Sequence, residues 1–272
     1  REVIVRQLPA VEGLGSCTEI CSDKTGTLTQ NRLTAKRILL PDGTDWTVSG
    51  EGMETEGTIS PEEDSKSEET ADQERIREVI RPGVLANEGR LSEEEGTMHA
   101  EGDSVDVAFL ILGRKAGLDR DRMETDRFPV VNEIPYSSDR KYAATFHEDP
   151  DGQGARVFVK GAAETLLEMC PDADQDEIGE QLEKLAREGY RIIAVAEGAV
   201  GSEEAREGAE SSLENLTLRG LVGLIEPLRP EVPDAVEACR TAGVGVRMVT
   251  GDHPETAFSI ARKLGIGRED QQ

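Results

Sequence analysis

The strongest constraint on the fold is a strand–turn–helix rhythm that occurs at both ends of the chain and is missing from its middle. Near the N-terminus the segment Ser16–Ser22 predicts a buried strand, and a turn rich in Thr and Gly begins at Asp23. Near the C-terminus Gly243–Val249 predicts a second strand, and a turn leads from it into a helix over Glu255–Leu264. This rhythm is typical of a parallel α/β sheet.

The segment between these two ends predicts a domain inserted into the first one. We expect residues 1–37 and 226–272 to form a split α/β domain, and residues 38–225 to form the insert. A further helix of the split domain is predicted from Pro230 to Arg240. The split part is small for a doubly wound parallel sheet, so we expect that sheet to be incomplete.

Local patterns predict a mixture of strands and helices in the insert. The predicted strands are Ala35–Leu40, Trp46–Val48, a hairpin over Asn132–His147, Arg156–Val159, Arg191–Ala196 and Leu218–Ile225. The predicted helices are Glu74–Leu91 with an interruption at Pro82-Gly83, Asp103–Ala116, Ala162–Met169 and Asp176–Glu188. An acidic loop is expected over Pro61–Gln73.

The charge balance excludes some classes of partner. The 272 residues include 56 acidic and 31 basic side chains, for a formal net charge of −25, which argues against binding to nucleic acid or to anionic lipid. No apolar run is long enough to cross a bilayer, and no signal peptide is recognisable. The four cysteines form no disulfide framework or zinc-ligand spacing, which indicates a reduced, cytosolic setting.

The acidic excess admits two interpretations. We hypothesise a host with a salty cytosol, because screening by salt lowers the self-repulsion of a strongly acidic surface. An acidic but otherwise ordinary surface is the alternative.

The first turn carries the residues best suited to chemistry. Asp23 follows a predicted strand, at the edge where open α/β sheets place their ligands, and an aspartate there can attack phosphorus to form an aspartyl-phosphate. The Lys-Thr-Gly-Thr sequence that follows supplies backbone N–H groups and hydroxyls, and Gly26 allows close approach of the backbone. The alternative is that Asp23 only caps a turn.

Five segments together carry a resemblance to a known family. They are Cys21–Asn31 (CSDKTGTLTQN), Gly102–Asp106 (GDSVD), Pro135–Lys141 (PYSSDRK), Lys160–Glu164 (KGAAE) and Met248–Asp252 (MVTGD). The first resembles the phosphorylation motif of the P-type ATPases, ion pumps of the haloacid-dehalogenase superfamily. The others resemble motifs of the nucleotide-binding and phosphorylation domains of the type II cation pumps. The resemblance extends over nearly the whole chain.

The resemblance implies a fold and a site of phosphorylation. The fold would be a split, partial haloacid-dehalogenase-like sheet with an inserted α+β nucleotide-binding domain on an antiparallel sheet. Asp23 would be the nucleophile that takes the γ-phosphate of ATP, and Mg²⁺ would bridge that phosphate, Asp23 and the carbonyl of Thr25. Thr250 would donate its hydroxyl to the phosphate, and Gly251 and Asp252 would shape the turn beside it.

Thr25 stands where phosphatases of this superfamily place an acid. A threonine hydroxyl is a poor general acid or base near neutral pH, so the resemblance implies a long-lived phosphoenzyme. Such an intermediate suits a pump, in which movement precedes hydrolysis.

The resemblance also implies an ATP pocket in the insert. Tyr136, on a strand, would stack on the adenine, where family members commonly have Phe. The remaining pocket residues are polar or small: Asp106 as acceptor of the adenine amino group, Lys141 and Lys160 as cations, Gly161 allowing close approach, and Arg191 reaching phosphate. Each also has a structural alternative, as a core aromatic, a solvated strand end or a partner of one of the many carboxylates.

Some positions depart from the family pattern. Glu226 precedes Pro227 where the family usually has Asp, and its role is left open. Ser138 stands where some members have Arg. The family's second metal-binding Asp, its phosphate-site Lys and all membrane helices would lie outside residues 1–272. We therefore expect a piece of a longer pump, with the nucleophile and the ATP pocket but an incomplete Mg²⁺ site.

The leading hypothesis is an ATP-binding catalytic fragment of a cation-transporting P-type ATPase, calcium-pump-like by its motifs. We expect the fragment to be a soluble, cytosolic monomer, and its parent to be an integral membrane protein with actuator and membrane domains as partners. The ligands of the transported ion would lie in those membrane helices. Two alternatives are a stand-alone phosphatase of the same superfamily and an ATP-binding module without turnover.

Overall fold

The computed structural model describes residues 15–62, 69–152, 154–251 and 254–266. The chain divides into two compact units: a split unit of residues 1–31 and 226–272, and an inserted unit of residues 32–225. The first division falls after Asn31 and not after residue 37, because the strand that begins at Thr34 hydrogen-bonds to the sheet of the inserted unit. The second division falls between Ile225 and Glu226.

The inserted unit is built on an eight-stranded sheet whose neighbouring strands are all antiparallel. In spatial order the strands are β4 (Ile59–Pro61), β3 (Asp45–Val48), β2 (Thr34–Leu39), β11 (Thr217–Ile225), β10 (Arg191–Val200), β9 (Ala155–Gly161), β8 (Tyr142–Glu148) and β7 (Val130–Ile134). The chain enters this unit through β2 and leaves through its neighbour β11. The antiparallel sheet expected for the insert is therefore confirmed.

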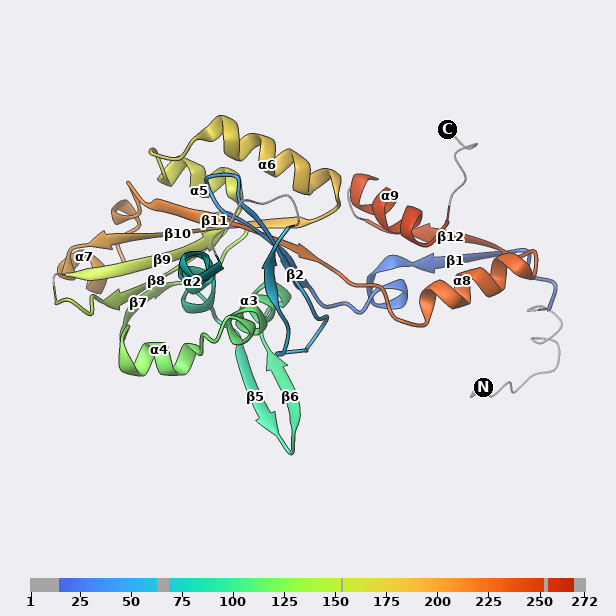
Figure 1. Cartoon of the computed structure of the whole chain (residues 1–272), viewed down its shortest axis with the longest axis horizontal. Helices are drawn as coiled ribbons and strands as arrows, with labels where there is room; N and C mark the ends of the chain where they lie inside the picture. The colour runs from blue at the N-terminus through green and yellow to red at the C-terminus, as the bar shows by residue number, and fades with distance from the viewer. Residues whose placement is uncertain (1–14, 63–68, 153, 252–253, 267–272) are drawn as a thin grey trace. The chain divides into compact units, whose positions relative to one another are not determined.

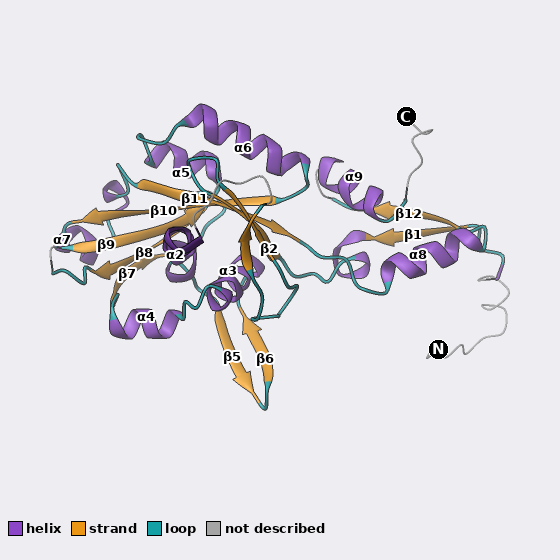
Figure 2. Ribbon diagram, viewed as in Figure 1, coloured by secondary structure: helices purple, strands orange, loops and turns teal. Residues whose placement is uncertain are grey.

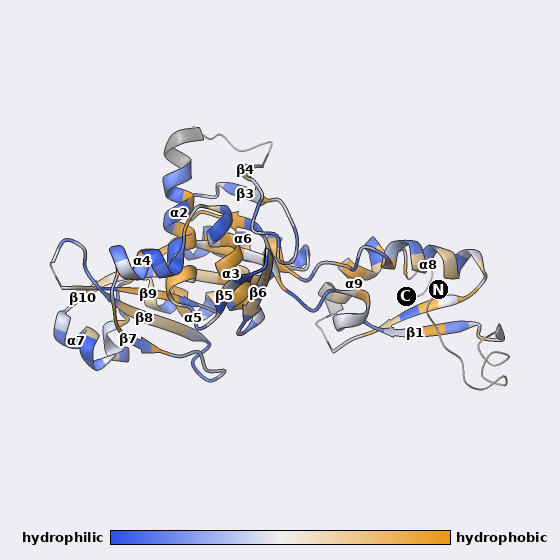
Figure 3. Ribbon diagram, turned by 90° about the horizontal axis from the view of Figure 1, so that it is seen from below, coloured by the Kyte–Doolittle hydropathy of each residue, from blue (hydrophilic) through white to orange (hydrophobic). Residues whose placement is uncertain are grey.

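Helices cover both faces of this sheet (Figure 1). The helices of the inserted unit are α2 (Glu69–Leu85), α3 (Ser104–Lys115), α4 (Arg120–Asp126), α5 (Ala163–Met169), α6 (Gln175–Arg187) and α7 (Ser202–Glu207). Residues of α2 and α3, among them Ile80 and Phe109, form one apolar cluster with the sheet. Residues of α5 and α6, among them Leu166 and Leu185, form another. In Figure 3 the apolar colour follows α3, whereas α2 and α4 show mostly hydrophilic colour.

Local signals explain where two of these helices begin. The side chain of Asp103 accepts a hydrogen bond from the backbone N–H of Val105 at 2.8 Å, at the start of α3. The side chain of Asp174 does the same for Asp176 and Glu177 at the start of α6. Such caps satisfy N–H groups that have no partner within the first turn.

A two-stranded hairpin stands away from the large sheet (Figure 2). It consists of β5 (Arg90–Glu94) and β6 (Thr97–Glu101), which pair only with each other among the described strands. The turn between them is Glu95-Gly96, with both residues at positive φ, of 51° and 76°. Positive φ at both residues of a two-residue turn matches the right-handed twist of the strands that it joins.

The split unit contains a short parallel sheet and two helices. Strand β1 (Glu19–Asp23) pairs in parallel with β12 (Gly245–Val249), and the helices are α8 (Val232–Thr241) and α9 (Pro254–Lys263). Both helices contribute to one apolar cluster together with Val246 and Met248 of β12. Two parallel strands are described here, so a doubly wound sheet stays a prediction.

The structure corrects three expectations. Strand β1 is largely exposed and not buried, because it has one strand neighbour among the described residues and Ile20 keeps 40% of its surface exposed. Helix α2 already begins at Glu69, inside the predicted acidic loop, and continues through Pro82. Arg90 and Leu91, expected at the end of that helix, instead begin β5.

Packing explains why Pro82-Gly83 does not interrupt α2. A Cβ atom on Gly83 would lie 2.1 Å from the ring of Phe109, so the missing side chain lets α3 pack directly on α2. The helix continues past the proline, where Ala86 N–H donates to the carbonyl of Pro82 at 2.9 Å. Tertiary contact thus outweighs the local tendency of this pair to end a helix.

No helix in the described ranges is both long and apolar enough to cross a bilayer.

Candidate functional site

A cavity of about 630 Å³ lies within the inserted unit. Its walls come from the start of α3, the connector between β7 and β8, the end of β9 and the start of β10. Charged and aromatic side chains that line it are Glu88, Asp103, Asp106, Tyr136, Lys141, Lys160, Glu164 and Arg191. Thus all six residues that the sequence assigned to a nucleotide pocket, including Gly161, line one cavity.

A buried ion pair forms the floor of this cavity. Lys160 Nζ pairs with Asp106 Oδ1, and their side chains are 6% and 12% exposed. The ammonium also lies 5.6 Å from the centre of the Phe109 ring. Burial lowers the pKa of Lys160, and the negative charge of Asp106 opposes that shift. Lys160 is therefore already paired with a carboxylate in this structure.

Asp106 is held on both sides. Its Oδ2 accepts the backbone N–H of Glu88 at 3.1 Å, and its backbone carbonyl accepts a hydrogen bond from Asn87 Nδ2 at 2.9 Å. Asn87 is itself buried and accepts the N–H of Gly89 at 2.9 Å. The segment 87–89, which sequence reasoning missed, thus fixes the position of the carboxylate.

Tyr136 lies in the connector after β7, and not on a strand as expected. Its side chain is 55% exposed, so it is not part of the core. Its backbone N–H donates to Glu88 Oε1 at 2.8 Å. An aromatic ring that lines a cavity and keeps an open face can stack on a planar base.

Two further cations line the cavity and remain more accessible than Lys160. Lys141 has a left-handed backbone, with φ of 60°, where the connector joins β8. Its Nζ lies 3.7 Å from Glu164 Oε1, and the two side chains are 55% and 71% exposed, so this pair is weak. Arg191 is exposed at the first position of β10. These two side chains can meet a phosphate.

Gly161 has a packing role that the sequence did not suggest. A Cβ atom at this position would lie 2.5 Å from the carbonyl oxygen of Lys141 and 2.8 Å from the Cα of Tyr142. The close contact is therefore with the neighbouring strand β8. A glycine is needed here whether or not a ligand is bound.

These features together fit a nucleotide. The volume lies within the usual range for small-molecule pockets. The cavity offers an exposed aromatic face, a fixed carboxylate acceptor and two accessible cations. That combination suits a ligand with a planar base at one end and phosphates at the other.

The second group of predicted residues lies in the split unit. The parallel register pairs Asp23 with Val249, so both strands end at the same edge of the short sheet. Thr250 and Gly251 follow at that edge, next in the chain after the partner of Asp23. Asp252 lies outside the described residues.

The turn after Asp23 includes a left-handed backbone conformation at Gly26, which a glycine adopts easily. Gly26 has φ of 72°, and its N–H donates to Thr29 Oγ1 at 3.3 Å. Asp23 makes no side-chain hydrogen bond that caps this turn, and it is exposed. The capping alternative for Asp23 is therefore not supported.

The oxygen atoms at this edge are of the kind that Mg²⁺ prefers. An exposed carboxylate without a capping role, such as that of Asp23, is compatible with a hard cation. No group of three or more His, Cys, Asp or Glu side chains that could hold a metal occurs in the part of the chain that is described.

Glu226, whose role the sequence left open, holds the turn together. One carboxylate oxygen accepts the hydroxyl of Thr29 and, at 2.7 Å, the N–H of Asn31. The other lies 2.9 Å from Lys24 Nζ, which is 6% exposed. The carboxylate thus joins the residue after Asp23 to the segment where the chain leaves the split unit.

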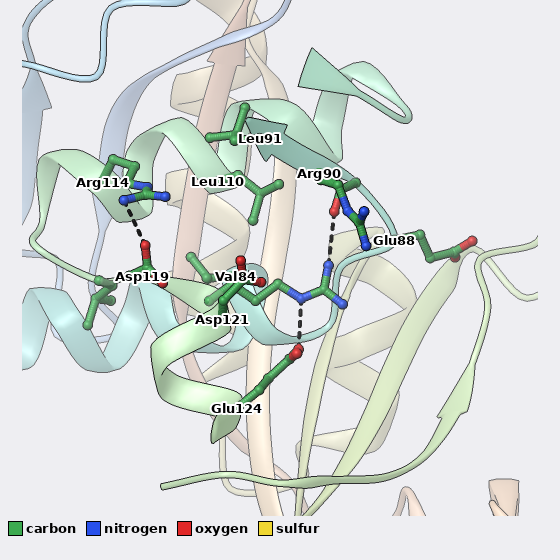
Figure 4. Close-up of a pocket in the computed structure, with 12 residues that line it drawn as sticks. Val84, Glu88, Arg90, Leu91, Leu110, Arg114, Asp119, Asp121 and Glu124 are labelled. Atoms are coloured by element: carbon green, nitrogen blue, oxygen red, sulfur yellow. Dashed lines mark hydrogen bonds and ion pairs between the residues drawn. The ribbon is translucent and has the colours of Figure 1, made fainter. Parts of the chain in front are cut away.

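A smaller cavity of about 220 Å³ adjoins the segment 87–89 (Figure 4). Its charged side chains are largely paired, with Arg114 at 2.7 Å from Asp119 and Arg120 at 2.7 Å from Glu124. Arg120 Nη1 also donates to the carbonyl of Gly89 at 2.9 Å. Glu88 lines this cavity as well as the larger one.

Comparison with known proteins identifies the inserted unit. Residues 75–231 match the family model described as "P-type ATPase, cytoplasmic domain N". The chain is 36% identical over 282 residues to "Cation-transporting ATPase pma1" of Synechocystis, covering 99% of this chain and 31% of the relative. It is 34% identical over 275 residues to "Calcium-transporting ATPase" of Bacillus subtilis, covering 97% and 30%. It is 35% identical over 297 residues to "Sodium/potassium exporting P-type ATPase cta3" of Schizosaccharomyces pombe, covering 98% and 28%. The chain thus spans less than a third of the length of these relatives.

Proposed function

Because the chain belongs to the P-type ATPase family, we propose that its inserted unit binds ATP and that its split unit carries Asp23 as the acceptor of the γ-phosphate. The observation that supports ATP binding best is the single cavity that gathers Tyr136, Asp106, Lys141 and Arg191. The base would stack on Tyr136, with its amino group toward Asp106. Lys141 and Arg191 would face the phosphates.

Lys160 takes a different role in this proposal from the one its motif suggested. Its ammonium is paired with Asp106, so it holds that carboxylate in place. The Lys160 ammonium would then lie beside the base and would not be a main ligand of the phosphates. Lys141 and Arg191, the accessible cations of the cavity, would bind the phosphates.

In the phosphoryl transfer, a carboxylate oxygen of Asp23 forms a bond to the γ-phosphorus while the bond from that phosphorus to the β-bridging oxygen of ATP breaks. ADP leaves, and Asp23 becomes an aspartyl-phosphate. Thr250 and the turn Gly251-Asp252 would hold the phosphate oxygens. Mg²⁺, bound by Asp23 and the carbonyl of Thr25, would neutralise charge on the phosphate.

Thr25 would make the phosphoenzyme persist. Its hydroxyl neither takes a proton from water nor gives one up readily near neutral pH, so hydrolysis lacks a general base at this position. In the parent protein a persistent phosphoenzyme would drive the transport of a cation. The names of the relatives include a calcium transporter, and we propose a calcium-pump-like parent, with this chain on the cytoplasmic side of the membrane beside the rest of the pump.

One alternative is supported by a specific observation. All residues that line the cavity belong to the inserted unit, which supports the alternative that this chain binds ATP without turnover. Incubation with γ-labelled ATP and Mg²⁺ separates the two cases. Label that is present on the wild type and absent from Asp23→Asn supports phosphorylation. Absence of label from both leaves ATP binding as the chain's own activity.

Calorimetry with ATP tests the binding site. We expect an affinity in the micromolar to millimolar range, about 4–8 kcal/mol. Tyr136→Ala and Lys141→Ala should each weaken binding about tenfold, because each loses one stacking or charge contact worth about 1–2 kcal/mol. Lys263→Ala, an exposed lysine of the split unit, is the matched control. Equal affinities in all four proteins would rule out this cavity.

A further inference from the structure

Glu88 makes two hydrogen bonds that join opposite walls of the nucleotide cavity. Its backbone N–H donates to Asp106 Oδ2 at 3.1 Å, on the wall formed by α3. Its side chain Oε1 accepts the backbone N–H of Tyr136 at 2.8 Å, on the wall formed by the β7–β8 connector. One residue therefore sets the spacing between a carboxylate and an aromatic ring that both line the cavity.

The backbone of Glu88 is itself held firmly. Arg120 Nη1 donates to the carbonyl of Gly89 at 2.9 Å, and Asn87 Oδ1 accepts the N–H of Gly89 at 2.9 Å. A Cβ atom on Gly102 would lie 2.7 Å from the Cα of Gly89, so this segment is packed closely against the start of α3. Asn87 adds a hydrogen bond to the carbonyl of Asp106. The carboxylate of Glu88 thus extends from a rigid base.

The neighbours of Tyr136 are held within the connector, where the carbonyl of Pro135 accepts Arg140 Nη2 at 2.9 Å and the carbonyl of Ser137 accepts the N–H of Lys141 at 2.7 Å. The ring of Tyr136 is 55% exposed, and the only described hydrogen bond of this residue is the one from its backbone N–H to Glu88. Figure 4 shows the Glu88 side chain directed away from Asp119, Asp121 and Glu124, the acids of the smaller cavity. Its carboxylate instead accepts the N–H of Tyr136, which lines the larger cavity. A ring on a connector loses less conformational freedom on binding when its backbone is already fixed.

We propose that Glu88 is a positioning residue for the nucleotide, which acts by fixing the backbone of Tyr136 through its carboxylate. This inference rests on the proposed ATP site. It adds a residue that does not itself stack on the base. Because Glu88 acts through Tyr136, its effect on binding should vanish when the aromatic ring is removed.

The binding test is a double-mutant cycle measured by calorimetry with ATP. Glu88→Ala should raise the Kd about tenfold, the effect of losing one charge-assisted hydrogen bond. Glu88→Gln keeps an acceptor oxygen and should stay within about threefold of the wild type. In a Tyr136→Ala background, Glu88→Ala should change the Kd by less than about twofold. Full additivity of the two substitutions, or no effect of Glu88→Ala alone, overturns the proposal.

Amide hydrogen exchange tests the contact without ATP. The Tyr136 amide should exchange about tenfold faster in Glu88→Ala than in the wild type or in Glu88→Gln. The Ala162 amide, which donates to the carbonyl of Lys141 beside the same cavity, is the internal control and should not change. Unchanged exchange at Tyr136 overturns the proposal even if ATP binds. If Glu88→Ala speeds exchange of the Tyr136 amide as expected but the wild type does not bind ATP, the proposed function is overturned and the contact stands.

Discussion

Among the residues that the structure describes, each unit contains one buried pair of a lysine and a carboxylate, and the two pairs are built differently. Lys160 and Asp106 in the inserted unit are 6% and 12% exposed, and Lys24 and Glu226 in the split unit are 7% and 11% exposed. Lys160 Nζ lies 5.6 Å from the centre of the Phe109 ring, and the Asp106 carboxylate accepts one further hydrogen bond, from the backbone N–H of Glu88. Glu226 instead accepts further hydrogen bonds from Thr29 and Asn31.

The difference shows what each pair is suited to do. Besides Lys160, the Asp106 carboxylate has one described hydrogen-bond donor, the backbone N–H of Glu88, so the pair in the inserted unit depends strongly on the match of its two charges. The pair in the split unit belongs to a hydrogen-bonded turn, so its carboxylate has other donors if the lysine is lost. The first is suited to hold a binding surface rigid, and the second to hold a turn in register.

The largest expected effect comes from breaking the pair in the inserted unit. Lys160→Ala leaves Asp106 buried without its counter-charge, which should lower the free energy of unfolding of this unit by about 3–5 kcal/mol. Trp46 is the chain's single tryptophan and is buried in the inserted unit, so its fluorescence during urea denaturation reports on this unit.

The control for this prediction removes both charges. Lys160→Met combined with Asp106→Asn should recover most of the lost stability, because no uncompensated charge remains. If Lys160→Ala were as stable as the wild type, the pair would be exposed to solvent in solution, and the contrast between the two units would fail.

A smaller effect is expected in the split unit. Glu226→Ala should destabilise the turn by about 1–3 kcal/mol, because Lys24, Thr29 and Asn31 lose a shared partner. Glu226→Asp keeps the charge but is shorter by one methylene, and we expect it to lose less. Exchange of the Asn31 amide measures this, and Trp46 fluorescence should not respond. A response of Trp46 as large as for Lys160→Ala would show that the units do not unfold separately.

The sequence predicted the elements whose causes are local. The helices predicted over Asp103–Ala116 and Asp176–Glu188 have local causes, an N-terminal cap in the first and amphipathic periodicity in the second, and the structure confirms both at 104–115 and 175–187. Helix α2 was mispredicted at Pro82, because its continuity depends on Phe109, which is distant in sequence. The short hairpin of β5 and β6 was missed because its strands are too polar to show an apolar alternation.

The same distinction applies to the candidate sites. Motif resemblance singled out Lys160 and Asp106 separately, but nothing local indicates that residues 54 positions apart form one ion pair. Glu88 carries no motif, and a glutamate in a chain with 56 acidic residues gives no signal of its own. Its role follows only from the three-dimensional contacts with Asp106 and Tyr136.

The smallest expected effect concerns a buried histidine in the inserted unit. His147 is fully buried, with Nδ1 at 2.7 Å from the carbonyl of Phe128 and Nε2 at 2.8 Å from Thr145 Oγ1. Burial lowers the pKa of His147, although the hydrogen bond to Phe128 opposes this shift. The unfolded chain, with a histidine pKa of about 6.5, then binds more protons than the folded one just below that pH.

The free energy of unfolding should therefore fall as the pH is lowered from 7 through about 6.5, until the folded-state pKa of His147 is passed. His147→Gln should reduce this slope, whereas His99→Gln, at an exposed position of the hairpin, should leave it unchanged. Urea denaturation followed by Trp46 fluorescence at several pH values measures the slope in all three proteins. An equal slope in the wild type and His147→Gln would mean that carboxylates alone cause the pH dependence. The stability of the inserted unit would then show no pH dependence due to a histidine. The two units would not differ in this respect, because no histidine is described in the split unit.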